Sequence, residues 1–182
     1  PRNIYGVTKL AAENLCRLHH LDHGLHCVVL RTGRFFPEDD DSLFELSGEN
    51  LKANEFLNRR LTVEDAARAH VAALDRAPAI GFGVFIISAP TPFRRDDAAA
   101  LGADARSVVT RIFPDAARLY ESRGWRLPER ITRVYDASRA RRDLGFECKT
   151  SFQSVLDALR SGAALPFAHD PSFAPPVSRA LV

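Results

Sequence analysis

The residues with the clearest chemical potential stand near the start of the chain, where Tyr5 and Lys9 lie four positions apart. In a helix this spacing places both side chains on one face, one turn from each other. A phenol with a pKa of about 10 is a poor base at neutral pH, but a neighbouring ammonium favours the phenolate. Such a tyrosine can take the proton from a substrate hydroxyl while hydride leaves the same carbon. Tyr5 is therefore predicted to be a catalytic base with Lys9 as its partner. The alternative interpretation is two exposed helix residues.

The elements around this pair predict an α/β fold. Apolar residues at three- and four-residue steps predict a helix over 6–23, which Gly24 ends. Leu25–Leu30 and Gly83–Ser88 are short apolar runs rich in β-branched residues, typical of buried parallel strands. A helix, a short turn and a buried strand in succession indicate a doubly wound parallel sheet.

Further helices are expected between and after these strands. Asn50–Asn58 is a candidate short helix, and Thr62 is expected to cap a longer one that ends before Pro78. Beyond Pro90, prolines separate short predicted helices over 107–112, 115–123, 138–144 and 152–159. This second part of the chain is expected to be a smaller, mainly helical module.

Three segments, in order, carry a family resemblance. They are Tyr5-Gly-Val-Thr-Lys-Leu-Ala-Ala-Glu13 followed by Val28-Val29-Leu30-Arg31, then Leu61-Thr-Val-Glu-Asp-Ala-Ala-Arg-Ala-His70, and Val134-Tyr-Asp-Ala-Ser-Arg-Ala-Arg-Arg-Asp-Leu-Gly-Phe146. Together they resemble the extended short-chain dehydrogenase/reductases, the group that contains the NAD-dependent epimerases and dehydratases of sugar nucleotides. The resemblance implies a Rossmann-like fold, NAD or NADP as cofactor, a sugar-nucleotide-like small molecule as substrate and a homodimer through the Tyr-bearing helix.

The resemblance also implies roles for individual residues. Tyr5 and Lys9 are expected to be catalytic and to contact the cofactor, while Arg31, Thr32 and Gly33 are expected to pass beside the nicotinamide. Arg34 and Arg126 are expected to bind substrate, and Arg126 falls near a family arginine that holds the nucleotide diphosphate. Sugar epimerases commonly have an asparagine where Arg34 falls, so Arg34 is expected to meet a phosphate or carboxylate, or to form a surface ion pair with Glu38 or Asp39.

The family's Gly-rich phosphate turn, acidic ribose residue and Ser/Thr partner of the tyrosine all precede the tyrosine. Only four residues precede Tyr5. We therefore expect the C-terminal half of an enzyme, inactive in isolation, with a Gly-rich turn encoded upstream. Residues 1–90 are expected to be the C-terminal part of a dinucleotide-binding domain with a substrate-side excursion around 36–60. A small substrate-binding domain over 91–162 and an extended tail over 163–182 are expected to follow.

Composition excludes several classes of protein. The 182 residues are 46% hydrophobic and 26% charged, with a net charge of +2, and their mean hydropathy is −0.17. No apolar run approaches the roughly 20 residues that span a bilayer, and the balanced charge gives no sign of a nucleic-acid partner. Three scattered cysteines fit a reduced, cytoplasmic protein. A metal is not expected, either at the histidines between His19 and His26 or at the acidic run 38–41.

Two functions remain open from the sequence. The first is an NAD(P)-dependent epimerase, dehydratase or reductase in which Tyr5 is the base. The second is a dinucleotide-binding sensor or scaffold of the same fold that performs no catalysis. The Tyr5–Lys9 pair favours the first, whereas Arg34 and the unusual tail favour the second.

Overall fold

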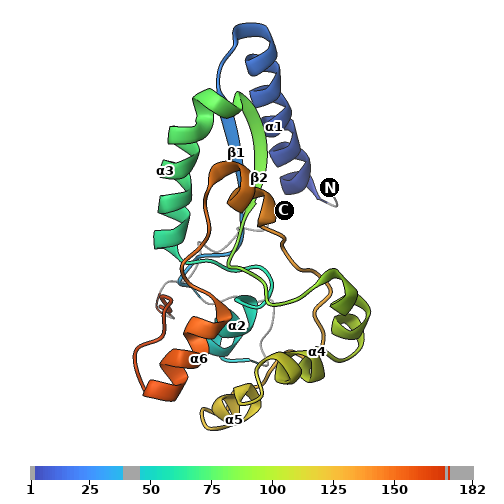
Figure 1. Ribbon diagram of the computed structural model, residues 1–182, viewed down its shortest axis with the longest axis vertical. Coiled ribbons are helices and arrows are strands. Elements are labelled where there is room, and N and C mark those ends of the chain that lie inside the picture. The colour runs from blue at the N-terminus through green and yellow to red at the C-terminus, as the bar shows by residue number, and fades with distance from the viewer. Residues whose placement is uncertain (1–2, 39–45, 171, 173–182) are drawn as a thin grey trace, which may run out of the picture.

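A computed structural model describes residues 3–38, 46–170 and 172. Its upper part is a layered α/β unit (Figure 1) in which α1 (Ile4–His23) leads into β1 (Cys27–Thr32), and α3 (Val63–Ile80) leads into β2 (Phe82–Ile87). The two strands pair in parallel, from Cys27 opposite Phe82 to Thr32 opposite Ile87. The expected parallel α/β arrangement is confirmed.

The helix ends follow ordinary capping chemistry. The Asn3 side chain accepts a hydrogen bond from the Gly6 amide at 2.9 Å and begins α1, and Gly24, in the left-handed region at φ 67°, ends it. The Thr62 side chain accepts from the Asp65 amide at 3.1 Å and begins α3, as expected. Pro78 lies inside α3 rather than beyond its end, so that expectation was wrong. The helix continues for two further residues and stops at Gly81.

The strands are less buried than their apolar sequences suggest. Four residues of β1, Cys27–Leu30, are half-buried, and β2 alternates between half-buried and buried residues. The cause is the loose contact of α1, which has no buried residue. Its half-buried face, with Glu13, Cys16 and His20, lies toward β1. The apolar residues of α1 are exposed: Ile4, Tyr5, Val7, Leu10, Leu15, Leu18 and Leu21.

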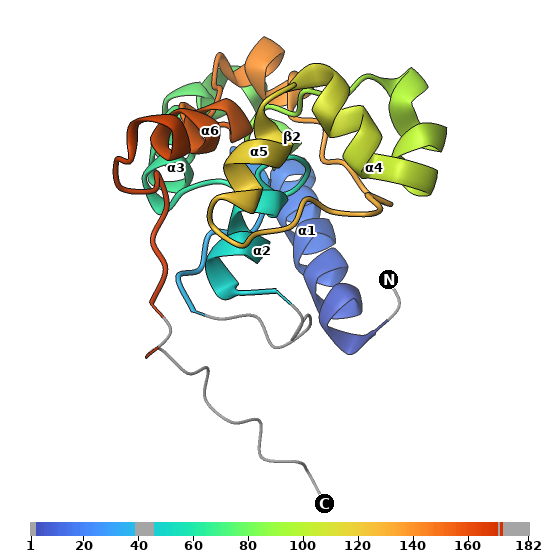
Figure 2. The same cartoon turned by 90° about the horizontal axis from the view of Figure 1, so that it is seen from below.

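The lower part of the molecule is mainly helical. It contains α2 (Gly48–Glu55), α4 (Ala98–Ile112), α5 (Ala116–Glu121) and α6 (Phe152–Ser161), which cluster together when the molecule is seen from below (Figure 2). A short 3₁₀ turn, η1 (Arg95–Asp97), precedes α4, and a π-helical turn, η2 (Ala140–Leu144), precedes Gly145. The helical module is therefore present, and α2 from the 36–60 segment belongs to its core.

One of these helices begins earlier than its sequence suggests. α4 was expected from Ser107, but it starts at Ala98 and contains a kink at Asp104, whose φ of −151° and ψ of 81° are not helical. The Asp104 carboxylate accepts from the Ser107 amide at 3.0 Å. Asp104 thus caps the second half of the helix, which is the half that the sequence pattern identified.

Two apolar clusters hold the fold together. The first joins α2, α4, α5 and α6 around Phe56, Tyr120 and Phe152. The second joins both strands and α3 with Leu144, Phe146 and Cys148. Because this second cluster includes Ala140, Leu144, Phe146 and Cys148, the segment over 140–148 packs against the sheet and connects the helical module to it. The division of the chain at residues 90 and 162 stays a prediction.

The described part of the tail folds back onto α2. Phe167 packs against Phe56 with ring centroids 5.6 Å apart. The buried ammonium of Lys52 lies 2.7 Å from Nδ1 of His169 and also contacts the Pro37 carbonyl. The end of the described tail therefore lies against α2 and, through the Asp170 amide that donates to the Pro37 carbonyl at 2.9 Å, against the segment that follows β1.

Candidate functional site

Tyr5 and Lys9 form the first part of the candidate site, at the beginning of α1. The Lys9 ammonium lies 5.5 Å from the centroid of the Tyr5 ring, and the tyrosine is 67% exposed. The Thr8 hydroxyl donates to the Tyr5 carbonyl at 2.9 Å, inside the same turn. The predicted juxtaposition of phenol and ammonium is therefore present, and both groups are accessible to a ligand.

The position of this pair follows from the direction of α1. The helix runs antiparallel to β1, so its first turn lies on the side of the end of the sheet toward which the strands run (Figure 1). In parallel α/β sheets, ligands bind beyond the carboxyl ends of the strands. Tyr5 and Lys9 thus lie at the edge of the sheet where chemistry is expected.

Arg31 and Thr32 end β1 close to this edge. The Arg31 guanidinium donates two hydrogen bonds to the Glu13 carboxylate, at 2.8 and 2.6 Å. These bonds lower the pKa of Glu13. Arg31 therefore tethers α1 to β1. That contact, rather than any ligand, accounts for its orientation.

Gly33 has a packing reason to be glycine. It is buried, and a Cβ atom at this position would lie 2.5 Å from the carbonyl oxygen of Arg59. Its amide donates to the Ile87 carbonyl at 2.7 Å. The residue lets the chain after β1 pass directly against the segment around Arg59, which sets the position of Arg34.

Among the described residues, Arg34 pairs with Glu55 and not with Glu38; the pair expected with Asp39 falls outside the described residues. Nε of Arg34 lies 3.2 Å from the carboxylate of Glu55, a buried residue of α2. Burial lowers the pKa of Arg60, and the negative charges of Glu55 and, more weakly, of Glu38 offset part of this lowering. The backbone of Arg34 bonds with Arg59 and Leu61 on either side of Arg60.

Arg126 lies on a hollow of about 490 Å³ between α2 and the extended chain over 126–133. Its backbone is fixed by two asparagines of α2. The Arg126 carbonyl accepts from the side chains of Asn50 and Asn54 at 3.0 Å, and its amide donates to Asn50 at 2.9 Å. Its side chain is exposed. The hollow is also lined by further charged residues: Glu55, Arg59, Glu129, Arg130 and Arg133.

The contribution of α2 to this hollow was not predicted from the sequence. Glu55 lies in the stretch 50–58 that the pattern identified only as a short helix, and Arg59 and Arg60 follow it directly. The signal that could have revealed them is the pair Arg59-Arg60 directly before the apolar residue Leu61. A charged pair at the entrance to a buried segment needs a partner, because an unpaired buried charge is costly.

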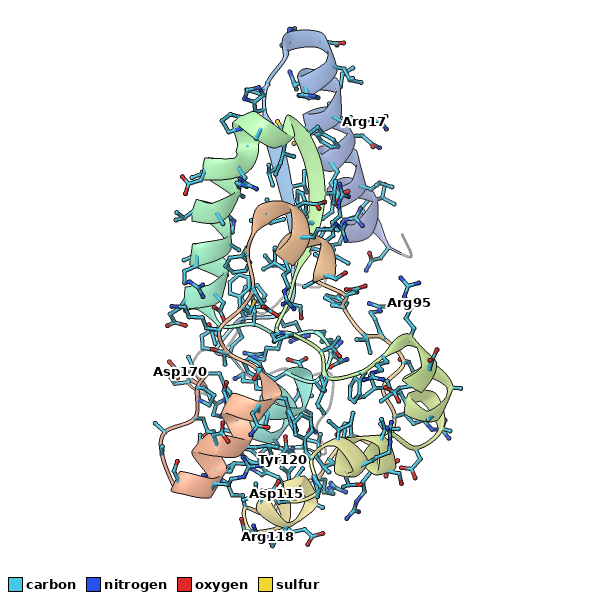
Figure 3. All side chains as sticks on the ribbon, viewed as in Figure 1. Arg17, Arg95, Asp115, Arg118, Tyr120 and Asp170 are labelled. Atoms are coloured by element: carbon cyan, nitrogen blue, oxygen red, sulfur yellow. The ribbon has the colours of Figure 1, made fainter. Side chains whose placement is uncertain are left out.

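Other candidate side chains have structural roles. Tyr120 and Trp125 pack edge-to-face at 5.5 Å within the helical module, and Tyr120, labelled in Figure 3, is 1% exposed. Burial raises the pKa of the Tyr120 phenol. The rings of His19 and His23 lie 5.5 Å apart, but no group of histidine, cysteine or acidic residues suited to a metal occurs in the described residues.

Comparisons with known proteins give the fold. No protein-family description and no curated protein matches the chain. A solved structure of UDP-N-acetylglucosamine 4-epimerase from Bacillus cereus is similar, with a TM-score of 0.52 and 19% identity over 88% of this chain and 52% of that chain. RMD from Pseudomonas aeruginosa, complexed with NADPH, gives a TM-score of 0.47 and 21% identity, over 88% of this chain and 55% of that one.

The chain thus spans about half the length of both solved structures, 52% and 55%. At these identities, what it shares with the epimerase is the α/β fold. The fold class expected from the sequence is confirmed. No helix in the described residues is both long and apolar enough to cross a membrane.

Proposed function

We propose that this chain forms part of an NAD(P)-dependent epimerase or dehydratase of the short-chain dehydrogenase/reductase type that acts on a sugar nucleotide. The observation that carries the proposal is the Lys9 ammonium 5.5 Å from the Tyr5 ring, at the ligand-binding edge of a parallel sheet. The fold shared with a UDP-sugar epimerase and the arginine-lined hollow support it.

The residues at this edge fit the nicotinamide end of a dinucleotide. Lys9 is exposed and has donors for ribose hydroxyls, and Tyr5 is exposed beside it. Arg31, Thr32 and Gly33 lie where the chain leaves β1, and they would pass alongside the nicotinamide. A bound nicotinamide supplies the acceptor for hydride.

Tyr5 and Lys9 then have separate tasks in the reaction. The Tyr5 hydroxyl oxygen takes the proton of the substrate hydroxyl while hydride leaves the carbon that carries it. Lys9 places its positive charge beside the Tyr5 ring and would hold the ribose through its donors. Returning the proton and the hydride to the opposite face of the resulting ketone would complete an epimerisation.

The substrate would extend from Tyr5 into the hollow beside α2. Arg126, Arg130 and Arg133 line this hollow on one side, and Arg59 lines it from α2's side. Arginine suits a diphosphate because its planar fork of donors matches pairs of phosphate oxygens. We assign Arg126 to the diphosphate, and Arg34 to the part of the substrate nearest the sheet.

A homodimer through α1 belongs to the same proposal. The helix exposes Val7, Leu15 and Leu18, eight and three positions apart, on the side that faces away from β1. An apolar stripe of this kind is typical of a contact surface. A second copy of α1 could cover it.

The direct test is an assay of the complete gene product with NAD or NADP and a panel of UDP-hexoses. We expect reduced nicotinamide to appear, or one UDP-hexose to convert into its epimer, as followed by absorbance and by NMR of the sugar protons. Saturable dinucleotide binding without turnover of any UDP-sugar would instead favour the sensor or scaffold.

A further inference from the structure

Two of the three cysteines of the chain lie on the surfaces where α1 and β1 meet. Cys16 belongs to the half-buried face of α1 that lies toward β1, with Glu13 and His20 one turn away on either side. Cys27 is the first residue of β1. Alternate residues of a strand point to the same side, so Cys27 shares the side of Arg31. Because the Arg31 guanidinium bonds to Glu13, this is the side of the strand that faces α1.

The contact between the helix and the strand is held on both sides of these cysteines. On one side is the ion pair between Glu13 and the end of β1. On the other side, Nδ1 of His20 lies 2.9 Å from the Leu25 carbonyl, just before the strand. Cys16 stands between Glu13 and His20 on the helix, so its thiol is confined to the part of the contact where Cys27 begins the strand.

The two thiols interact with each other. Burial raises the pKa of the Cys27 thiol, and the Cys16 thiol raises it further by its charge and by a hydrogen bond between the two groups. Both residues are half-buried, so a small reagent can reach them. Cys148 is buried, and it belongs to the apolar cluster that Val28 and Leu30 join on the opposite side of β1. The fold therefore pairs Cys16 with Cys27 and keeps Cys148 apart from both.

We propose that Cys16 and Cys27 form a reversible disulfide bond between α1 and β1, by thiol–disulfide exchange with a small-molecule disulfide. In the first step one protein thiolate attacks a sulfur of the small disulfide, which leaves a mixed disulfide and releases one small thiol. In the second step the other protein thiolate attacks the protein sulfur of the mixed disulfide and releases the second small thiol. The two protein thiols lose two electrons and two protons, and the small disulfide takes these up as two thiols.

The bond would act on the helix that carries Tyr5 and Lys9. Since α1 has no buried residue, little packing holds it to the sheet. A covalent bond from its second half to β1 would restrict its movement relative to the strand, and with it the position of the two side chains. The inference concerns the attachment of α1 and does not depend on which reaction the protein catalyses.

The test is peptide mapping of the 182-residue chain after equilibration with oxidised and reduced glutathione. Iodoacetamide then blocks the remaining thiols. Trypsin cleaves after Lys9, Arg17 and Arg31, so the bond links the peptides 10–17 and 18–31. We expect this linked pair in mass spectrometry and its loss after reduction with dithiothreitol. The number of free thiols should fall from three to one on oxidation.

Variants assign the bond to this pair of cysteines. Cys148→Ala is the matched control, because it retains both cysteines and should give the linked peptides as the wild type does. Cys27→Ser should give none and should stop at the mixed disulfide on Cys16. If Cys27→Ser does not fold, Cys16→Ser makes the same test from the helix side. Linked peptides that are lost in folded Cys148→Ala would overturn the assignment.

A comparison with the unfolded chain tests whether the fold itself favours the bond. Two cysteines eleven positions apart also meet in an unfolded chain. A disulfide that fits the fold stabilises it, so the equilibrium constant for exchange with glutathione should be at least about ten-fold larger in the folded chain than in concentrated urea. An equal or smaller constant in the folded chain would overturn the proposal. Glutathione attached to the folded wild type without linked peptides, or linked peptides found only in a covalent dimer on a non-reducing gel, would overturn it as well.

Discussion

Replacing Asp65 with alanine should cost much of the stability of the fold. Asp65 stands in the first turn of α3 and is 2% exposed. Its two carboxylate oxygens accept hydrogen bonds from the backbone amides of Lys149 and Thr150, at 3.0 and 3.1 Å. The same carboxylate pairs with Arg68 at 2.6 Å. One side chain therefore connects α3 to the chain that leads into α6.

The magnitude follows from these contacts. A hydrogen bond to a charged group contributes about 1.5–3 kcal/mol. The two hydrogen bonds from backbone amides determine the expected loss in the free energy of unfolding, because the Arg68 side chain is 41% exposed and its ion pair contributes little. Lys149 is exposed and Thr150 half-buried, so water replaces part of the loss and the lower end of the range applies. We expect a cost of about 3 kcal/mol, or a fall in Tm of about 6–12 °C.

Urea unfolding followed by circular dichroism measures this cost. Asp75→Ala is the matched control, because Asp75 is an exposed acidic residue of the same helix. It should change the free energy of unfolding by less than about 0.5 kcal/mol. A cost for Asp65→Ala below about 1 kcal/mol would refute the reasoning, since each charge-assisted bond alone should exceed that value.

Three further predictions concern other parts of the chain. Burial raises the pKa of Cys148 to about 12. Iodoacetamide near pH 8 should therefore label the half-buried Cys16 before Cys148. Equal labelling rates of the two cysteines in mass spectrometry would contradict this. Arg31 lowers the pKa of Glu13 below 4.5, so this pair should stabilise the fold above about pH 4.5 and cease to do so as pH falls through the lowered pKa. Thermal unfolding of Glu13→Gln and wild type should accordingly converge in acid, and a constant gap would speak against the pair. Leu18→Glu on α1 should convert a dimer into a folded monomer in sedimentation velocity, whereas a monomeric wild type would contradict the proposed contact.

Local features of the fold were predictable from the sequence because single residues determine them. Gly24 and Thr62 end and begin helices through their own backbone and side-chain chemistry. Asp104 was missed for the converse reason. It interrupts α4 with a non-helical backbone conformation, and the sequence pattern predicted only the half of the helix that Asp104 caps.

Tertiary contacts of the candidate site were not predictable in the same way. The Tyr5–Lys9 spacing lies within one helix, so periodicity was enough to place the two side chains together. Arg34 pairs with Glu55, on an element 21 positions further along the chain. Glu38 was the nearer partner in sequence, but the course of the chain past Gly33 brings Arg34 to α2 instead.

The proposed mechanism depends on Tyr5 more than on any other residue. The most direct test compares Tyr5→Phe with Lys9→Ala in the complete gene product, by turnover of the proposed UDP-sugar substrate and by NAD affinity. Tyr5→Phe removes one hydroxyl and should lower turnover by roughly 10²–10⁴-fold with little change in NAD affinity. Lys9→Ala should lower turnover and weaken NAD binding together, because it removes both the charge beside the phenol and the ribose donors. A folded Tyr5→Phe enzyme that keeps more than about a tenth of its turnover would contradict the account, and the base would then lie elsewhere.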